Sequence, residues 1–340
     1  MKLSRILQLV GGLAIAAAGL AIFFRNVDLH KLGTELRATS IWAVVAGLAL
    51  AVLTIWFRAI RFKLILPDSP GTHKRMMFQN VMISYMINNV LPARLGEVAK
   101  VLLLWKRNKY RPAEGVGSLV VERLLDTATL AMLFIIPVFV LPVLQPLRSM
   151  ATILLGVWLC GAMAAGLYVI FPKAWAAVAR KLVVLLPAKT QKRVQKVGIE
   201  LLSGLRWAFD IKKVLVIVVL SFLMELCYGL IFWFFLPERT LTTVLDGCFA
   251  TAFGAVGAAI PLSPGYVGTL HAMALQALNY LGVDEDKGRA IAILFHAVTF
   301  LPVTAIGLWF FFKTDLSFKQ IEESRKDINA EEERETTGPQ

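Results

Sequence analysis

The sequence predicts an all-α integral membrane protein with six to eight transmembrane helices and two broken or re-entrant elements in an inverted repeat. Apolar residues make up 57% of its 340 residues, and the mean hydropathy is +0.67. Several apolar runs are about 18 residues or longer, which is enough to cross a hydrocarbon core of about 30 Å. The third observation is a pair of similar segments that interrupt apolar stretches half a chain apart.

The paired segments share an apolar residue, Pro, Gly and Val in the same register. Residues 91–98 read LPARLGEV, and residues 260–267 read IPLSPGYV. Proline removes a backbone donor and breaks a helix, whereas glycine tolerates turn geometry. Inside a membrane, broken backbone survives only where it is buried in protein or lines a watery cavity. Such paired interruptions indicate the binding site of a transporter.

The apolar runs and the basic residues together predict a topology. We expect crossings at 6–24, 41–57, 116–144, 150–171, 214–236 and 290–312, and broken elements at 77–105 and 244–281 that enter and leave on one side. With the N-terminus inside, 21 Lys and Arg residues fall in the inside segments and 7 in the outside segments, as the positive-inside rule requires. The charge count does not distinguish re-entrant elements from full helical hairpins, which would give eight or more spans.

We expect one transporter domain at 1–312, with repeats at about 1–145 and 150–312, and a disordered, charged cytoplasmic tail at 313–340. The net charge of +13 would suggest nucleic acid in a soluble protein, but basic loops on one side of a membrane explain it here. The three cysteines show no disulfide or metal spacing. No phosphate-binding G-x-x-x-x-G-K-[ST] loop occurs, so we expect no cofactor and no direct use of ATP.

Charged residues cluster within the apolar segments, where each costs about 2.5–3.5 kcal/mol at a helix centre. The cluster consists of Arg94, Glu97, Lys100, Glu122, Arg123 and Asp126. Glu122 and Asp126 repel each other at i,i+4, so we expect Arg123 to serve Asp126, and Arg94 or Lys100 to serve Glu122. Two interpretations remain open: a functional pocket, or a purely structural group of ion pairs at the inner end of a long helix.

An anionic headgroup is the ligand that these elements favour. The planar guanidinium of Arg94 suits a phosphate, and the helices expected to resume after Gly96 and Gly265 would aim free N–H groups at an anion. Asn88 and Asn89 either add hydrogen bonds to the ligand or satisfy freed carbonyls. The candidate substrate-binding residues are Asn88, Asn89, Arg94, Glu97, Lys100, Glu122, Arg123, Asp126, Ser263, Gly265 and Tyr266.

Other polar residues within the spans have less specific interpretations. We expect Arg58 and Arg61 to snorkel to the inner interface. Glu225 lies in the middle of a span, where it pairs with a cation or carries a proton. His271 and His296 are each expected to pack in the core with one hydrogen bond rather than relay protons. Glu225, His271 and His296 are the candidates for proton or ion coupling, and we expect no catalytic or metal-binding residue.

Three motifs in this order resemble the membrane domain of bacterial lysyl-phosphatidylglycerol synthase/flippase proteins. They are NNxLPxRxGE at 88–97, ERxxD at 122–126 and PxSPGYxG at 261–268, and the resemblance covers about residues 5–315. It implies an inner-membrane protein, with both termini cytoplasmic in our topology, that moves lipids such as aminoacylated phosphatidylglycerol or glycosylated polyprenyl phosphates between leaflets. The bifunctional members carry a soluble transferase domain after the membrane part. We find none here, so we expect no lysyl transfer.

The sequence thus predicts a lipid flippase or scramblase that is not an enzyme. The expected partners are membrane lipids with anionic headgroups, and nucleic acid is not expected. Two alternatives stay open: a membrane enzyme that acts on lipid phosphates, and a non-transporting scaffold that partners a lipid-modifying synthase of the envelope. The sequence leaves the lipid, the direction, the energy source and the oligomeric state undetermined.

Overall fold

The computed structural model describes residues 28–67, 72–91, 95–142, 145–171, 174, 191, 206–237, 243–259 and 264–314. Every regular element in these ranges is a helix, which confirms the all-α class. The elements are α2 (Leu29–Ala38), α3 (Ile41–Ile65), α4 (Lys74–Val90), α5 (Leu95–Asn108), α6 (Pro112–Val140), α7 (Gln145–Ile170), the 3-10 helix η1 (Arg206–Phe209), α10 (Ile211–Phe235), α11 (Thr243–Ala259), the 3-10 helix η2 (Pro264–Tyr266), α12 (Thr269–Tyr280) and α13 (Glu285–Phe311).

Five of the described helices, α3, α6, α7, α10 and α13, are long and apolar enough to cross a membrane. They coincide with five of the six crossings expected from the sequence, and the sixth, at 6–24, lies outside the described residues. The tail expected at 313–340 also lies outside them from residue 315 onward. The chain is therefore a multi-pass membrane protein.

The two Gly/Pro-containing elements are both helix–break–helix structures, as expected. The first consists of α4 and α5, with 17 and 14 residues, and the second of α11 and α12, with 17 and 12 residues. At a rise of 1.5 Å per residue even a 17-residue helix is only about 26 Å long, which is less than the hydrocarbon core. We call α4/α5 the first hairpin and α11/α12 the second hairpin.

Close backbone contact holds the two helices of each hairpin together. A Cβ atom on Gly96 would lie 1.9 Å from the carbonyl oxygen of Ser84, and the Ser84 hydroxyl donates to the Gly96 carbonyl at 2.7 Å. In the second hairpin, a Cβ atom on Gly257 would lie 2.4 Å from the Thr269 carbonyl oxygen. Only glycine leaves room for the partner backbone at either position.

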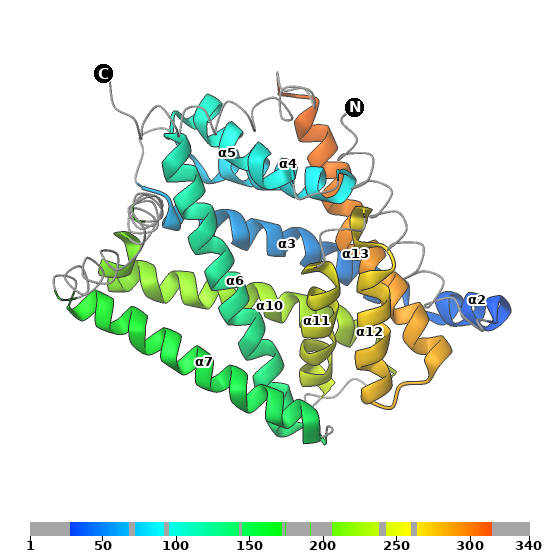
Figure 1. Cartoon of the computed structure of the whole chain (residues 1–340). Helices are drawn as coiled ribbons and strands as arrows, with labels where there is room; N and C mark the ends of the chain where they lie inside the picture. The colour runs from blue at the N-terminus through cyan, green and yellow to red at the C-terminus, as the bar shows by residue number, and fades with distance from the viewer. Residues whose placement is uncertain are drawn as a thin grey trace.

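Helices α3 and α10 run side by side, the first hairpin packs on α3, the second hairpin packs on α10, and α13 runs beside both hairpins (Figure 1). Between them the core is apolar and aromatic, and the rings of Phe232 and Phe295 stack at 3.8 Å. Helix α7 presents exposed apolar side chains such as Ile153, Val157 and Met163. That face suits contact with acyl chains, and it leaves the polar side chains to the interior.

Candidate functional site

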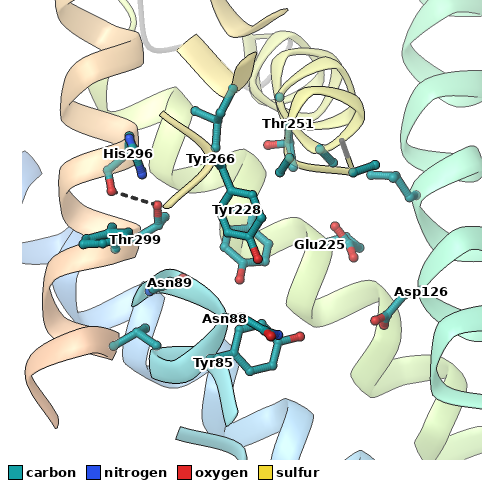
Figure 2. A pocket seen from close by; sticks show the side chains of 18 of the residues that line it. Tyr85, Asn88, Asn89, Asp126, Glu225, Tyr228, Thr251, Tyr266, His296 and Thr299 are labelled. Atoms are coloured by element: carbon teal, nitrogen blue, oxygen red, sulfur yellow. Dashed lines mark hydrogen bonds between the residues drawn. The ribbon is translucent and has the colours of Figure 1, made fainter. Parts of the chain in front are cut away.

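A cavity of about 350 Å³ lies between the two hairpins and helices α3, α6, α10 and α13. Its polar lining on the α4 and α6 side is Tyr85, Asn88, Asn89, Arg123, Asp126 and Thr127, and α3 adds Arg58. Its polar lining on the other side is Glu225, Tyr228, Thr251, Tyr266, His296 and Thr299. Figure 2 labels most of these side chains, and the labelled ones face one space from α4, α6, α10, α11, η2 and α13.

The two broken elements meet at this cavity. Gly265 has φ +61°, a left-handed conformation that favours glycine. A Cβ atom there would lie 3.4 Å from the Asn89 carbonyl oxygen and 3.1 Å from the ring of Phe300. The turn of the second hairpin therefore lies against the C-terminal end of α4.

A buried ion network supports the α6 wall of the cavity. Asp126 accepts hydrogen bonds from Arg58 at 2.6 Å and from Arg61 at 2.5 Å, and Arg61 also donates to the Ser221 hydroxyl on α10 at 3.0 Å. Arg61 is fully buried and Arg58 is 5% exposed. These contacts tie α3 to α6 and α10 next to the cavity.

A second carboxylate on α6 completes the buried part of the network. Lys100 of α5 donates to Glu122 at 2.6 Å, and Glu122 also lies 3.7 Å from Arg58 and 3.8 Å from Arg61. The Lys100 ammonium lies over the Phe62 ring at 3.9 Å. Of the two cations that the sequence offered for Glu122, Lys100 is the one in contact, whereas Arg94 lies outside the described residues.

Arg123 is the cation of the network that is most open to the cavity. Its side chain is 35% exposed, and it pairs with Glu97 at 2.7 Å and with Asp126 at 3.5 Å, the latter as expected from the i,i+3 spacing. We define the ion network as Arg58, Arg61, Glu97, Lys100, Glu122, Arg123 and Asp126. Its members Arg58, Arg123 and Asp126 line the cavity, and the others lie behind this wall.

The expectation that Arg58 and Arg61 snorkel to the interface is wrong. Both side chains are buried in the ion network, because they bind the Asp126 carboxylate and lie within 3.8 Å of Glu122. The i,i+3 spacing of the two arginines on α3 places them on one helix face. The sequence signal for this pairing was the i,i+3 spacing of the two arginines together with the i,i+4 spacing of Glu122 and Asp126.

The asparagines complete the first hairpin. The Asn88 side-chain carbonyl accepts the Gly96 N–H at 2.8 Å, and the Asn89 amide donates to the Thr304 hydroxyl on α13 at 2.9 Å. Helix α5 begins at Leu95, before Gly96 rather than after it. The N–H of Gly96, which lies in the first turn of α5, is thus already bonded, and Asn88 satisfies a freed backbone donor rather than a freed carbonyl.

A buried histidine pair joins the second hairpin to α13. His271 Nε2 and His296 Nδ1 lie 3.2 Å apart, and the Gly268 N–H donates to His271 Nδ1 at 3.2 Å. A neutral His271 therefore carries its proton on Nε2 and donates it to His296. Core packing was expected for each histidine, but the sequence did not reveal that they contact each other. Helix α12 begins at Thr269, so it resumes later than expected after Gly265.

Glu225 differs from the other buried acids. It lines the cavity from α10 and is 6% exposed. Within the described residues no ion pair or hydrogen bond of its carboxyl group is found. Figure 2 shows its side chain facing the same space as that of Asp126, from α10 and α6 respectively. Two roles were expected for Glu225, pairing with a cation or carrying a proton. No cation pairs with it among the described residues.

The structure brings most sequence candidates to one place. Asn88, Asn89, Arg123, Asp126 and Tyr266 line the cavity, as do Glu225 and His296. Glu97, Lys100 and Glu122 support the wall without lining it. Ser263, like Arg94, lies outside the described residues.

Sequence reasoning missed several hydroxyl groups of the lining. These belong to Tyr85, Tyr228, Thr251 and Thr299. Single hydroxyl residues on apolar helices carry no local signal, because they are common in packed helices. Tyr85, Tyr228 and Thr299 did have one, because each lies three residues from a candidate residue (Asn88, Glu225 and His296, respectively) and hence on the same helix face.

Comparison with known proteins matches this architecture to a family. Residues 9–307 match the family model described as the lysylphosphatidylglycerol synthase TM region. The chain is also similar to the UPF0104 membrane protein MJ1078 of Methanocaldococcus jannaschii. The two are 24% identical over 228 residues, which are 66% of this chain and 93% of that protein. The matched region contains both broken hairpins and every described helix except the last four residues of α13. The chain therefore belongs to the family of the lysylphosphatidylglycerol synthase transmembrane region.

Proposed function

We propose that this protein is a flippase or scramblase that moves an anionic or aminoacylated phospholipid, or a polyprenyl-phosphate-linked lipid, between leaflets. One observation carries the proposal: a polar cavity bordered by guanidinium, amide and hydroxyl groups lies between two broken hairpins in a protein with apolar outer helices. Such interrupted helices mark the substrate sites of transporters. The headgroup passes through the cavity while the acyl chains stay in the bilayer.

The lining supplies donors suited to a phosphate. Arg123 and Arg58 present guanidinium groups, whose planar fork fits phosphate oxygens. The amides of Asn88 and Asn89 and the hydroxyls of Tyr85 and Tyr228 surround the same space. Because the Gly96 N–H is already bonded, side chains carry most of the recognition in the first hairpin. Arg94 and Ser263 join the site in this proposal.

The proposed transport uses two inverted repeats, at about residues 1–145 and 150–312. Each repeat contributes one hairpin, and the hairpins enter from opposite faces of the membrane. The contact between Gly265 and the Asn89 backbone supports this arrangement, since it joins the two hairpins at the cavity. The excess of basic residues in alternate loops supports an orientation with both termini in the cytoplasm. The proposed location, the bacterial inner membrane, rests on the resemblance to lysyl-phosphatidylglycerol synthase/flippase proteins.

A lipid-movement assay tests this function. Purified protein is reconstituted into vesicles that contain fluorescent phosphatidylglycerol, and dithionite reports the label that reaches the outer leaflet. We expect the wild type to expose the inner-leaflet label and Arg123→Ala to slow this by about 10- to 100-fold, since a hydrogen bond to a charged group contributes about 1.5–3 kcal/mol. Arg123→Lys, which keeps the charge without the fork, should fall between the two.

The matched control is Arg37→Ala on α2, an exposed arginine away from the cavity, which should keep wild-type activity. No label movement by the wild type above protein-free vesicles would refute the proposal. Full activity of Arg123→Ala would show that the headgroup does not use this cavity. Chemical turnover of the lipid without movement would favour a membrane enzyme instead.

A further inference from the structure

The described part of the ion network has unequal numbers of charges. It contains four cations, Arg58, Arg61, Lys100 and Arg123, and three carboxylates, Glu97, Glu122 and Asp126. Counting the described residues alone, the network at the wall of the cavity thus carries one positive charge in excess. A phosphate diester, which carries a single negative charge, would balance it.

Glu225 is the fourth carboxyl group at this place, and its state decides the balance. Ionised, it cancels the excess positive charge and faces an arriving phosphate with a like charge across the cavity. Protonated, it leaves the excess in place and offers an O–H donor. An isolated ionised carboxylate is costly inside a membrane protein, and Glu225 has no bonding partner among the described residues.

The charged and titratable groups around Glu225 come from α10 itself and from α3, α6, α11 and α13, which pack on it. Asp126 of α6 repels its ionised form, whereas Arg58 and Arg61 of α3 attract it. Both arginines bind Asp126 within 2.6 Å, and neither forms an ion pair with Glu225. The remaining groups are Cys227 and Tyr228 on α10 itself, Cys248 on α11 and His296 on α13. The arginines are thus already engaged by another acid.

We propose that Glu225 binds a proton together with the anionic headgroup, so that each strengthens the binding of the other. The inference rests on the proposed function, because it requires an anionic lipid in the cavity. The proton enters on the Glu225 carboxylate oxygen, and the headgroup then meets a cavity with a net positive wall. The cavity with protonated Glu225 and a bound phosphate therefore has the same net charge as the empty cavity with ionised Glu225. Thermodynamic linkage makes the effect reciprocal.

Lipid binding at different pH values tests the coupling. Native mass spectrometry measures phosphatidylglycerol retained by the full chain between pH 8 and pH 5.5. We expect the wild type to bind about tenfold more tightly at the lower pH, within the range of typical couplings between sites. Glu225→Gln, a neutral isostere, should bind tightly throughout, with a pH dependence below about twofold. Asp246→Asn, an acid in the first turn of α11 that does not line the cavity, should keep the wild-type pH dependence.

Proton uptake by the wild type gives a second readout that needs no variant. In weakly buffered solution near pH 7, phosphatidylglycerol should cause uptake of protons, and zwitterionic phosphatidylcholine should cause much less. The proton site would be overturned if Glu225→Gln kept the wild-type pH dependence, or if the wild type bound the lipid without proton uptake. Either result would leave the proposed function intact. Absence of lipid binding at every pH would instead overturn the proposed function.

Discussion

The pair formed by Lys100 and Glu122 allows an asymmetric stability prediction. The two side chains are almost fully buried and lie 2.6 Å apart. Glu122→Gln removes the carboxylate from Lys100 and also from Arg58 and Arg61, at 3.7 and 3.8 Å. Losing one partner of a buried ion pair costs about 3–5 kcal/mol, because the remaining charge is uncompensated. We therefore expect this variant to lose about that much unfolding free energy.

Lys100→Met should cost less, about 1.5–3 kcal/mol, because Glu122 keeps the two arginines near its other oxygen. In the Glu122→Gln background, the effect of Lys100→Met on the unfolding free energy should reverse its sign. Lys100 is then a buried ammonium without its carboxylate, so Lys100→Met should restore about 1–3 kcal/mol. The matched control is Lys106→Met on the same helix, an exposed position where the change should stay within about 0.5 kcal/mol.

The assay is equilibrium unfolding in mixed micelles with increasing SDS, read out by tryptophan fluorescence. The four proteins of the double-mutant cycle give the coupling energy between the two side chains. Equal losses from Lys100→Met in both backgrounds would show that the pair does not interact. A Glu122→Gln variant that is no less stable than Lys100→Met would refute the arrangement of the three cations around Glu122.

Three further predictions concern packing around the network. Gly96→Ala should destabilise the first hairpin by about 1–3 kcal/mol, whereas Gly156→Ala, which meets no atom within 4 Å, should not; SDS unfolding checks both. Asn88→Ala should cost about 1–3 kcal/mol by orphaning a buried N–H, and amide hydrogen exchange of Gly96 should accelerate. Ser221→Ala should cost about 1 kcal/mol in the same unfolding assay by removing an acceptor from Arg61.

The fold was largely predictable because membranes impose simple rules. Apolar runs longer than the hydrocarbon thickness located α3, α6, α7, α10 and α13. The proline and glycine residues of the paired segments predicted that the helices break near residues 92 and 261. The exact restart positions were less predictable, since Asn88 and Ser84 contact Gly96 inside the first helical turn of α5.

The site was predictable in part. The pair Arg123–Asp126 followed from charge signs and helical spacing, whereas Lys100 was one of two cations expected for Glu122. The burial of Arg61 did not follow, because it depends on which helices α3 contacts, and that is a property of the tertiary structure. For the same reason, the contact between His271 and His296, which lie 25 residues apart on α12 and α13, could not be predicted from the sequence.

Access of water and lipid to the cavity tests the central claim most directly. The three native cysteines, Cys160, Cys227 and Cys248, are replaced by alanine, and Thr251→Cys is introduced in the lining. We expect a charged, membrane-impermeant thiol reagent to label this cysteine and phosphatidylglycerol to slow the labelling, whereas Val157→Cys on the apolar face of α7 should resist the reagent. A position 251 that stays unlabelled, or that is labelled equally fast with and without the lipid, would contradict a water-filled cavity that receives the headgroup.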